Sequence, residues 1–258
     1  MPINKGFIKE DEMVINLNNH LVKDINSNLK DMLEKLFGAL GENENIECEI
    51  VRDFAKPDIV ITYKGEKRYV SIKTGSANSV HSEFVEYFVE YLKKNGISQE
   101  TLNTILLFQY GDGTLDGTGE KRMIYNEIMT KYANEIRKAN EELNANPNFV
   151  CEMVCHYLFD GSRPELPSAD AIYYGDIYNG YLVNRQQVRS HLRKRKWNQL
   201  NNPHIGPLLI RATARYPDKR DTYERKRHRV NLAWLYLSED IKYISTHYFY
   251  DYKCIKRD

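Results

Sequence analysis

The sequence predicts an α/β protein, because segments with the periodicity of strands alternate with segments with the periodicity of helices. Residues 59–63 and 68–73 are rich in Val, Ile, Tyr and Thr, and the short polar stretch between them contains Gly, which is typical of a β-hairpin. A third strand-like segment lies at 46–51. Apolar residues recur with helical spacing within 12–38 and again within 79–92, so we expect helices on either side of the three strands.

The hairpin brings an acid and a base together at one of its ends. If Gly65-Glu66 is the two-residue turn, the residue numbers of any two cross-strand partners add up to 131, and Asp58 therefore lies opposite Lys73. Side chains alternate between the faces of a strand, so Ser71 and Lys73 share a face. Taken singly, an Asp before a strand is often a turn residue and a Lys at a strand end is often a solvated edge charge. Together they can hold a divalent metal and orient or activate a water for phosphodiester cleavage.

The helix predicted at 79–92 offers a further carboxylate. It has a serine start, and its apolar stripe centres near Val85, Phe88 and Leu92. Glu86 lies at the border of this stripe, from which it can reach the end of the sheet. Glu83 and Glu90 fall nearly opposite the stripe, and Glu83 is the reserve candidate. The alternative is that all three glutamates are solvated charges on an amphipathic helix.

The rest of the chain gives weaker signals. The other predicted elements are a strand at 104–109, a long charged helix within 120–145, a helix or arm at 186–192, and strands at 205–216 and 230–237. The tyrosine-rich segment 171–181 either packs in a β-rich region or contacts sugar, phosphate or base, and the sequence leaves both open. Asp31 and Glu34 on the first helix are better explained as surface charge.

Pro57-Asp58 followed by Ser71-Ile72-Lys73 resembles the signature of the PD-(D/E)XK nuclease superfamily, which includes most type II restriction endonucleases. The position two before the Lys is normally acidic, and here it is Ser71. A variant within the restriction enzymes has a non-acidic residue there and takes the missing carboxylate from the following helix. Lys73 plus twelve intervening residues leads to Glu86. The resemblance covers the stretch from the first helix to about residue 110.

This resemblance implies a restriction-endonuclease-like core, a mixed central β-sheet flanked by helices, with the order helix, three strands, helix, strand. It also implies Mg²⁺ as cofactor, with Asp58 and Glu86 as metal ligands. Lys73 would position or polarise the attacking water and stabilise charge on the phosphate. Ser71 would sit where an acidic ligand usually does and hydrogen-bond a metal-bound water. Restriction enzymes usually cut palindromes, so a homodimer is the expected form.

Charge is distributed very unevenly along the chain. Between Arg185 and Arg229 there are fourteen Lys and Arg against three acids, a net charge of +11, whereas the whole chain carries only +1. Such concentration is typical of contact with a phosphate backbone, and the alternative is a solvated or acid-partnered surface. The residues we expect to contact DNA are Arg189, Arg193, Lys194, Arg195, Lys196, Lys219, Arg220, Arg225, Lys226 and Arg227.

A chain of 258 residues can be one large α/β domain or a core with an appended subdomain. Together with the resemblance, the charge distribution favours a single endonuclease domain over residues 1–258, with an acidic half at 1–147 that holds the catalytic core and a basic DNA-recognition half at 148–258. No apolar run approaches the length of a membrane span and the N-terminus lacks a signal peptide's apolar segment, so we expect a cytoplasmic protein. Cys151 and Cys155 lack a matching pair at zinc-site spacing and are expected to be core or surface thiols.

The sequence therefore predicts a Mg²⁺-dependent type II restriction endonuclease that acts on double-stranded DNA, with a possible cognate DNA methyltransferase encoded elsewhere. Two alternatives stay open. One is a structure-selective or repair nuclease of the same superfamily. The other is a nucleic-acid-binding protein whose catalytic site has decayed, for which Ser71 is the natural argument.

Overall fold

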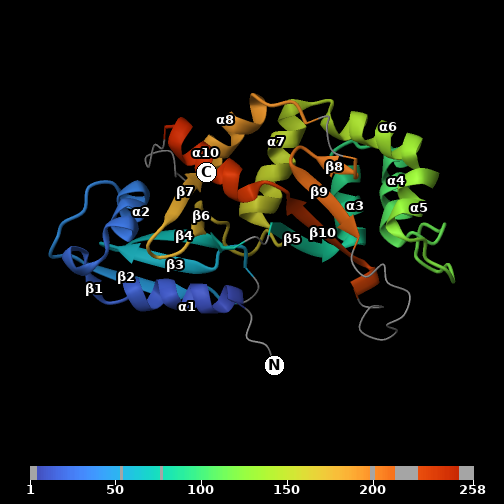
Figure 1. Ribbon diagram of the computed structural model, residues 1–258. Coiled ribbons are helices and arrows are strands. Elements are labelled where there is room, and N and C mark those ends of the chain that lie inside the picture. Colours follow the sequence, from blue (N-terminus) through green and yellow to red (C-terminus); the bar gives the residue numbers. More distant parts are fainter. Residues whose placement is uncertain (1–4, 53–54, 76–77, 198–200, 213–225, 250–258) are drawn as a thin grey trace. The chain divides into compact units, whose positions relative to one another are not determined.

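The computed structural model describes residues 5–52, 55–75, 78–197, 201–212 and 226–249 (Figure 1). The chain forms two compact units that are interleaved in sequence. Unit 1 comprises Met1–Ala77, Cys155–His191 and Tyr236–Asp258, and unit 2 comprises Asn78–Val154 and Leu192–Leu235. Each unit contains its own β-sheet, and both sheets are accompanied by helices, so the predicted α/β class is confirmed.

Unit 1 is built on a six-stranded mixed sheet of order β1-β2-β3-β4-β6-β7. Only the β4–β6 pairing is parallel, and the other neighbours are antiparallel. The strands are β1 (His20–Leu21), β2 (Asn45–Ile50), β3 (Ile59–Tyr63), β4 (Glu66–Lys73), β6 (Ala171–Gly175) and β7 (Gly180–Asn184). The accompanying helical segments are α1 (Lys5–Leu17), η1 (Val22–Asp24), α2 (Ser27–Phe37), η2 (His156–Asp160) and α10 (Leu237–His247).

The core of unit 1 forms where α1 and α2 bury their apolar stripes against the sheet. Leu29, Leu33 and Leu36 of α2 are fully buried together with Ile59 and Ile61 of β3. Asn26 caps α2, since its side chain accepts a hydrogen bond from the backbone N–H of Leu29. The helical pattern within 12–38 therefore corresponds to two helices, and α1 begins upstream of it.

Unit 2 contains a four-stranded antiparallel sheet of order β5-β10-β9-β8. Its strands are β5 (Ser79–Phe84), β8 (His204–Ile205), β9 (Leu208–Ala212) and β10 (Arg229–Trp234). Its helices are α3 (Val85–Lys94), α4 (Gln99–Tyr110), α5 (Tyr125–Lys131), α6 (Ala133–Asn144) and α7 (Pro147–Cys155). Helix α8 (Arg185–Arg193) crosses from unit 1 into unit 2. The long charged helix expected within 120–145 is thus two shorter helices, α5 and α6.

The strand predicted at 104–109 is wrong, because these residues belong to helix α4. Ser98 caps the helix start by accepting a hydrogen bond from the N–H of Thr101, and Gly111 ends it in the left-handed conformation at φ 67°. A short apolar run is compatible with either a buried strand or a buried helix, and the two caps decide for the helix. Beside β4 the sheet instead continues with β6, from far along the chain.

The helix predicted from residue 79 is also wrong over its first turn and a half. Residues 79–84 form β5, which pairs with β10, and α3 begins only at Val85. Long-range pairing with β10 therefore overrides a local pattern that fits a helix. The consequence for function is that Glu83 lies on a strand and Glu86 lies in the first turn of the helix.

Candidate active site

The β3–β4 hairpin turns one residue earlier than expected, which changes the partner of Asp58. Tyr63 pairs with Glu66, so Lys64-Gly65 is the two-residue turn, and both residues have positive φ, 49° and 80°. This is the pattern of a type I′ hairpin turn. Cross-strand partners therefore sum to 129, and the predicted sum of 131 is wrong. Continued by one residue, the register places Asp58 opposite Ser71.

Asp58 is held in place by the strand next to it. Its Oδ2 accepts a 2.9 Å hydrogen bond from the hydroxyl of Ser71 and another from the backbone N–H of Ile72. Ser71 is fully buried, whereas the carboxylate of Asp58 remains 24% exposed. Because two donors fix one carboxylate oxygen at the end of a rigid hairpin, the orientation of the whole group is set.

Lys73 shares the face of Ser71 and brings its ammonium to the same carboxylate. Its Nζ lies 4.0 Å from Oδ2 of Asp58, and its side chain is 18% exposed. On the neighbouring strand β6, Tyr174 pairs with Lys73 and donates its hydroxyl proton to the carbonyl of Gly75, just beyond β4. The three residues of the hairpin motif, Asp58, Ser71 and Lys73, are thus brought together as predicted, although the pairing between them differs.

A second carboxylate near this site comes from α1 and was missed in the sequence. Burial of Glu10 raises the pKa of its carboxyl, the negative charge of Asp58 raises it further, and the ammonium of Lys73 opposes the shift. Helix α1 packs against β2 and β4, and this packing is what places Glu10 within the electrostatic reach of both residues. No local motif singles out Glu10, because its position depends on tertiary contact alone. Asp31 and Glu34 on α2 are exposed, as expected for surface charge.

The two glutamates considered for the missing carboxylate belong to unit 2. Glu86 is exposed, whereas Glu83 is only 5% exposed, the reverse of the exposure that a helix over 79–92 would give. Oε2 of Glu83 lies 3.8 Å from Nε2 of His81, and its buried Oε1 has no hydrogen-bond partner among the described residues. A buried carboxylate oxygen without a donor is costly. The assignment of Glu86 as a metal ligand stays a prediction.

Most of the basic residues expected at the DNA are described. Arg193, Lys194, Arg195, Lys196 and Lys226 are exposed and Arg189 is partly buried. The guanidinium of Arg195 lies 5.0 Å from the centre of the Trp197 ring, a cation–π geometry. Lys219, Arg220 and Arg225 lie outside the described residues.

Arg227 differs from these residues because its guanidinium is engaged within the fold. It donates to the fully buried carboxylate of Asp112 and to the carbonyl of Gly119. It thereby ties the residues just before β10 to the loop after α4. A contact between Arg227 and DNA stays a prediction.

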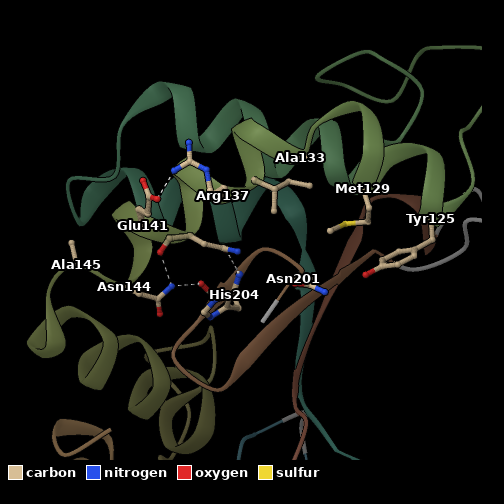
Figure 2. A pocket seen from close by; sticks show the side chains of 11 residues that line it. Tyr125, Met129, Ala133, Arg137, Glu141, Asn144, Ala145, Asn201 and His204 are labelled. Atoms are coloured by element: carbon tan, nitrogen blue, oxygen red, sulfur yellow. Dashed lines mark hydrogen bonds and ion pairs between the residues drawn. The ribbon is translucent and has the colours of Figure 1, made fainter. Parts of the chain in front are cut away.

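A pocket of about 850 Å³ lies elsewhere in unit 2, between α5, α6 and the segment before β8 (Figure 2). The side chain of Asn140 forms hydrogen bonds with the backbone of Asn202 and His204. The side chain of Asn144 forms hydrogen bonds with the backbone of His204 and Gly206. Arg137 is paired with Glu141 at its edge (Figure 2). The two asparagines therefore serve to fasten the segment to α6, and none of the predicted catalytic residues lines this pocket.

The described residues contain three buried cysteines. Cys48, Cys151 and Cys155 are buried and form no disulfide within the described residues, as expected of core thiols, and burial raises the pKa of Cys48 to about 12. In this part of the chain, no group of three or more His, Cys, Asp or Glu side chains is arranged to hold a metal ion. No described helix is long and apolar enough to cross a membrane.

Comparisons with known proteins give a similarity in structure but none in sequence. No protein-family model matches the sequence, and no curated protein matches it significantly. The crystal structure of restriction endonuclease MspI in complex with its cognate DNA is similar to this chain, with a TM-score of 0.49 and 14% sequence identity. The similarity covers 88% of each of the two chains.

Proposed function

We propose that this chain is a Mg²⁺-dependent endonuclease that cuts double-stranded DNA at a specific sequence, as type II restriction enzymes do. The observation that carries the proposal is the hairpin cluster, in which Asp58 is oriented by Ser71 and approached by Lys73 at 4.0 Å. An oriented carboxylate beside an ammonium, partly exposed at the end of a sheet, suits the charge that develops on a phosphate during cleavage.

The donor set in unit 1 fits a hard divalent cation. Asp58 and Glu10 lie close enough for the charge of one to raise the pKa of the other, and two carboxylates that repel each other are stabilised by a shared cation. Mg²⁺ typically binds through one or two carboxylates and keeps several waters or phosphate oxygens. The absence of a larger ligand cluster within the described residues is compatible with such a site. When bound, the cation would supply Lewis-acid stabilisation to a phosphate oxygen.

The chain's own residues have distinct roles in this proposal. Asp58 and Glu10 would hold the cation, and Asp58 needs a fixed orientation to do so. Ser71 acts as a positioning residue for Asp58 through its hydroxyl. Lys73 would orient the attacking water and stabilise negative charge on the scissile phosphate. The expected role of Ser71 as a partner of a metal-bound water is replaced by this contact with Asp58.

The proposed partner is duplex DNA, held by the exposed cations that follow α8. Recognition of a palindrome by a homodimer and the existence of a cognate methyltransferase remain part of the proposal.

Cleavage of phage-length duplex DNA by the purified protein in Mg²⁺, beside an EDTA control, tests the proposal. Discrete and reproducible fragments that require Mg²⁺ are the expected result. A smear would instead indicate a non-specific or repair nuclease. Intact DNA that shifts in a binding gel would indicate a protein that binds DNA without cutting it.

A further inference from the structure

The β5-β10-β9 part of the second sheet has two very different faces. Side chains alternate along each strand, and residues paired across an antiparallel sheet point to the same side. One face carries Val230, Leu232 and Ile210, which are buried. The opposite face is apolar and buried at Leu209 and Ala233. Towards the start of β10 it carries polar, cationic and aromatic residues that are exposed or only partly buried, namely Ser82, Phe84, Arg211, Arg229 and Asn231.

The strand register gathers these five residues into one patch, which we call the β10 face. Asn231 pairs with Ser82 on one side and with Arg211 on the other. Arg229 pairs with Phe84 one step along the strands. The patch therefore spans three adjacent strands, which run side by side in unit 2 (Figure 1).

Each arginine of the β10 face contacts neutral groups of neighbouring residues. The guanidinium of Arg229 lies 5.1 Å from the centre of the Phe84 ring and donates a 2.8 Å hydrogen bond to the carbonyl of Ser82. Nη1 of Arg211 donates a 3.1 Å hydrogen bond to Oδ1 of Asn78. None of the five residues of this face is acidic, so the patch has two fixed positive charges and no negative charge.

We propose that the β10 face contacts the backbone of duplex DNA, with Arg211 and Arg229 on phosphates and Phe84 against an adjacent sugar. This inference rests on the proposed function and deepens it, because it adds an interface separate from the exposed cations after α8. Arginine presents donors in a planar fork that suits phosphate oxygens, and its position here is already set before DNA arrives. Phe84 is 45% exposed, which leaves its ring available for apolar contact.

The salt dependence of duplex binding tests this interface. Dissociation constants would be measured in EDTA over a range of NaCl concentrations for the wild type, Arg211→Gln, Arg229→Gln and the double variant. Each phosphate contact contributes about 0.9 to the slope of log K against log salt. We expect each single variant to reduce the slope by about 1, and the double variant by about 2.

Two further variants separate the contribution of the two arginines from that of other cations and of the Phe84 ring. Lys94→Gln removes a cation of α3 in the same unit, 70% exposed and paired with Glu90, and should leave the slope unchanged. Phe84→Ala should weaken binding at every salt concentration without changing the slope, because the ring carries no charge. Thermal unfolding of every variant would show that the proteins compared are folded, and a merely structural role of either arginine would not lower the slope.

The outcomes distinguish this inference from the proposed function. If the wild type cuts DNA but the slope of the folded double variant equals that of the wild type, the β10 face does not contact DNA while the nuclease proposal stands. The same unchanged slope would overturn the inference even if the face were found to bind an acidic protein. If the slope falls as expected but the wild type does not cut, the interface stands and the nuclease proposal fails.

Discussion

The hydroxyl of Ser71 donates a 2.9 Å hydrogen bond to Oδ2 of Asp58. This contact explains how a serine can occupy a position where the nuclease signature that the sequence resembles has an acid. A second carboxylate at that buried position would face Asp58 at close range and be strongly disfavoured without a cation. The serine instead gives Asp58 a hydrogen-bond donor, which fixes the orientation of its carboxylate.

Ser71→Ala is expected to weaken Mg²⁺ binding while only slightly lowering the free energy of unfolding. The variant loses one hydrogen bond to Asp58 but keeps that from the N–H of Ile72, so we expect a loss of about 1 kcal/mol in the free energy of unfolding. The cleavage rate should fall about tenfold at low Mg²⁺ and recover as Mg²⁺ is raised. The measurement is the cleavage rate as a function of Mg²⁺ concentration. If the Mg²⁺ concentration for half-maximal rate is the same in the variant and the wild type, the positioning role of Ser71 is ruled out.

Lys73→Ala is expected to reduce single-turnover cleavage at least about 100-fold while duplex binding stays largely intact. The ammonium lies 4.0 Å from Asp58, and in the proposed mechanism it acts on the reacting phosphate, whereas affinity for the duplex would come mainly from many other cations. Lys67→Ala is the matched control, because Lys67 is an exposed lysine on the same strand. Equal cleavage rates for the two variants would show that the role assigned to Lys73 is wrong.

Glu10→Gln should make the fold more stable and the enzyme less active. Since burial and Asp58 raise the pKa of Glu10 above 4.5, the folded protein binds this proton more tightly than the unfolded chain does. The ionised carboxylate therefore lowers stability above the raised pKa, and this penalty fades as pH falls through that pKa. Denaturation in EDTA should show that the variant is more stable than the wild type at pH 7, with a smaller difference near pH 4.

The exposed Glu34 on α2 provides the control for this experiment. Glu34→Gln should show little change in stability at either pH. Mg²⁺-dependent cleavage should fall for Glu10→Gln and persist for Glu34→Gln. A stability difference for Glu10→Gln that is the same at both pH values would contradict the electrostatic origin of its shift.

Comparison of Glu83→Gln, Glu86→Gln and Glu90→Gln decides which glutamate of the 79–94 segment has a function. Exposure separates them, because Glu86 and Glu90 are exposed while Glu83 is buried with an unpaired oxygen. Because the proposed site is formed by Asp58, Glu10 and Lys73 of unit 1, we expect cleavage to stay near the wild-type rate in all three variants, provided that they are folded. Loss of cleavage in the Glu86 variant alone would support the interpretation that the sequence favoured.

Local sequence patterns predicted the hairpin but not its register. Strand periodicity and a Gly-containing turn were sufficient for β3 and β4, and they brought Asp58 and Lys73 to the same end of the sheet. The turn position depends on Lys64 adopting a positive φ of 49°, which non-glycine residues rarely do. A shift of one residue in that turn changed the partner of Asp58 from Lys73 to Ser71.

The remaining differences arise from contacts between distant parts of the chain. β5 is a strand because β10 pairs with it from about 150 residues away, and β6 joins β4 from about 100 residues away. Glu10 reaches the site only through the packing of α1, which no motif records. By contrast, helix α4 could have been predicted from the sequence, because Ser98 and Gly111 are both typical capping residues.

The most direct test of the hairpin site is the Mg²⁺-dependent cleavage of duplex DNA by the wild type and by Asp58→Asn, measured side by side. The substitution keeps the shape of the side chain and removes the charge that a divalent cation needs. We expect discrete fragments from the wild type, none in EDTA, and none from a folded Asp58→Asn protein that still binds DNA. Cleavage by Asp58→Asn at the wild-type rate would contradict the account.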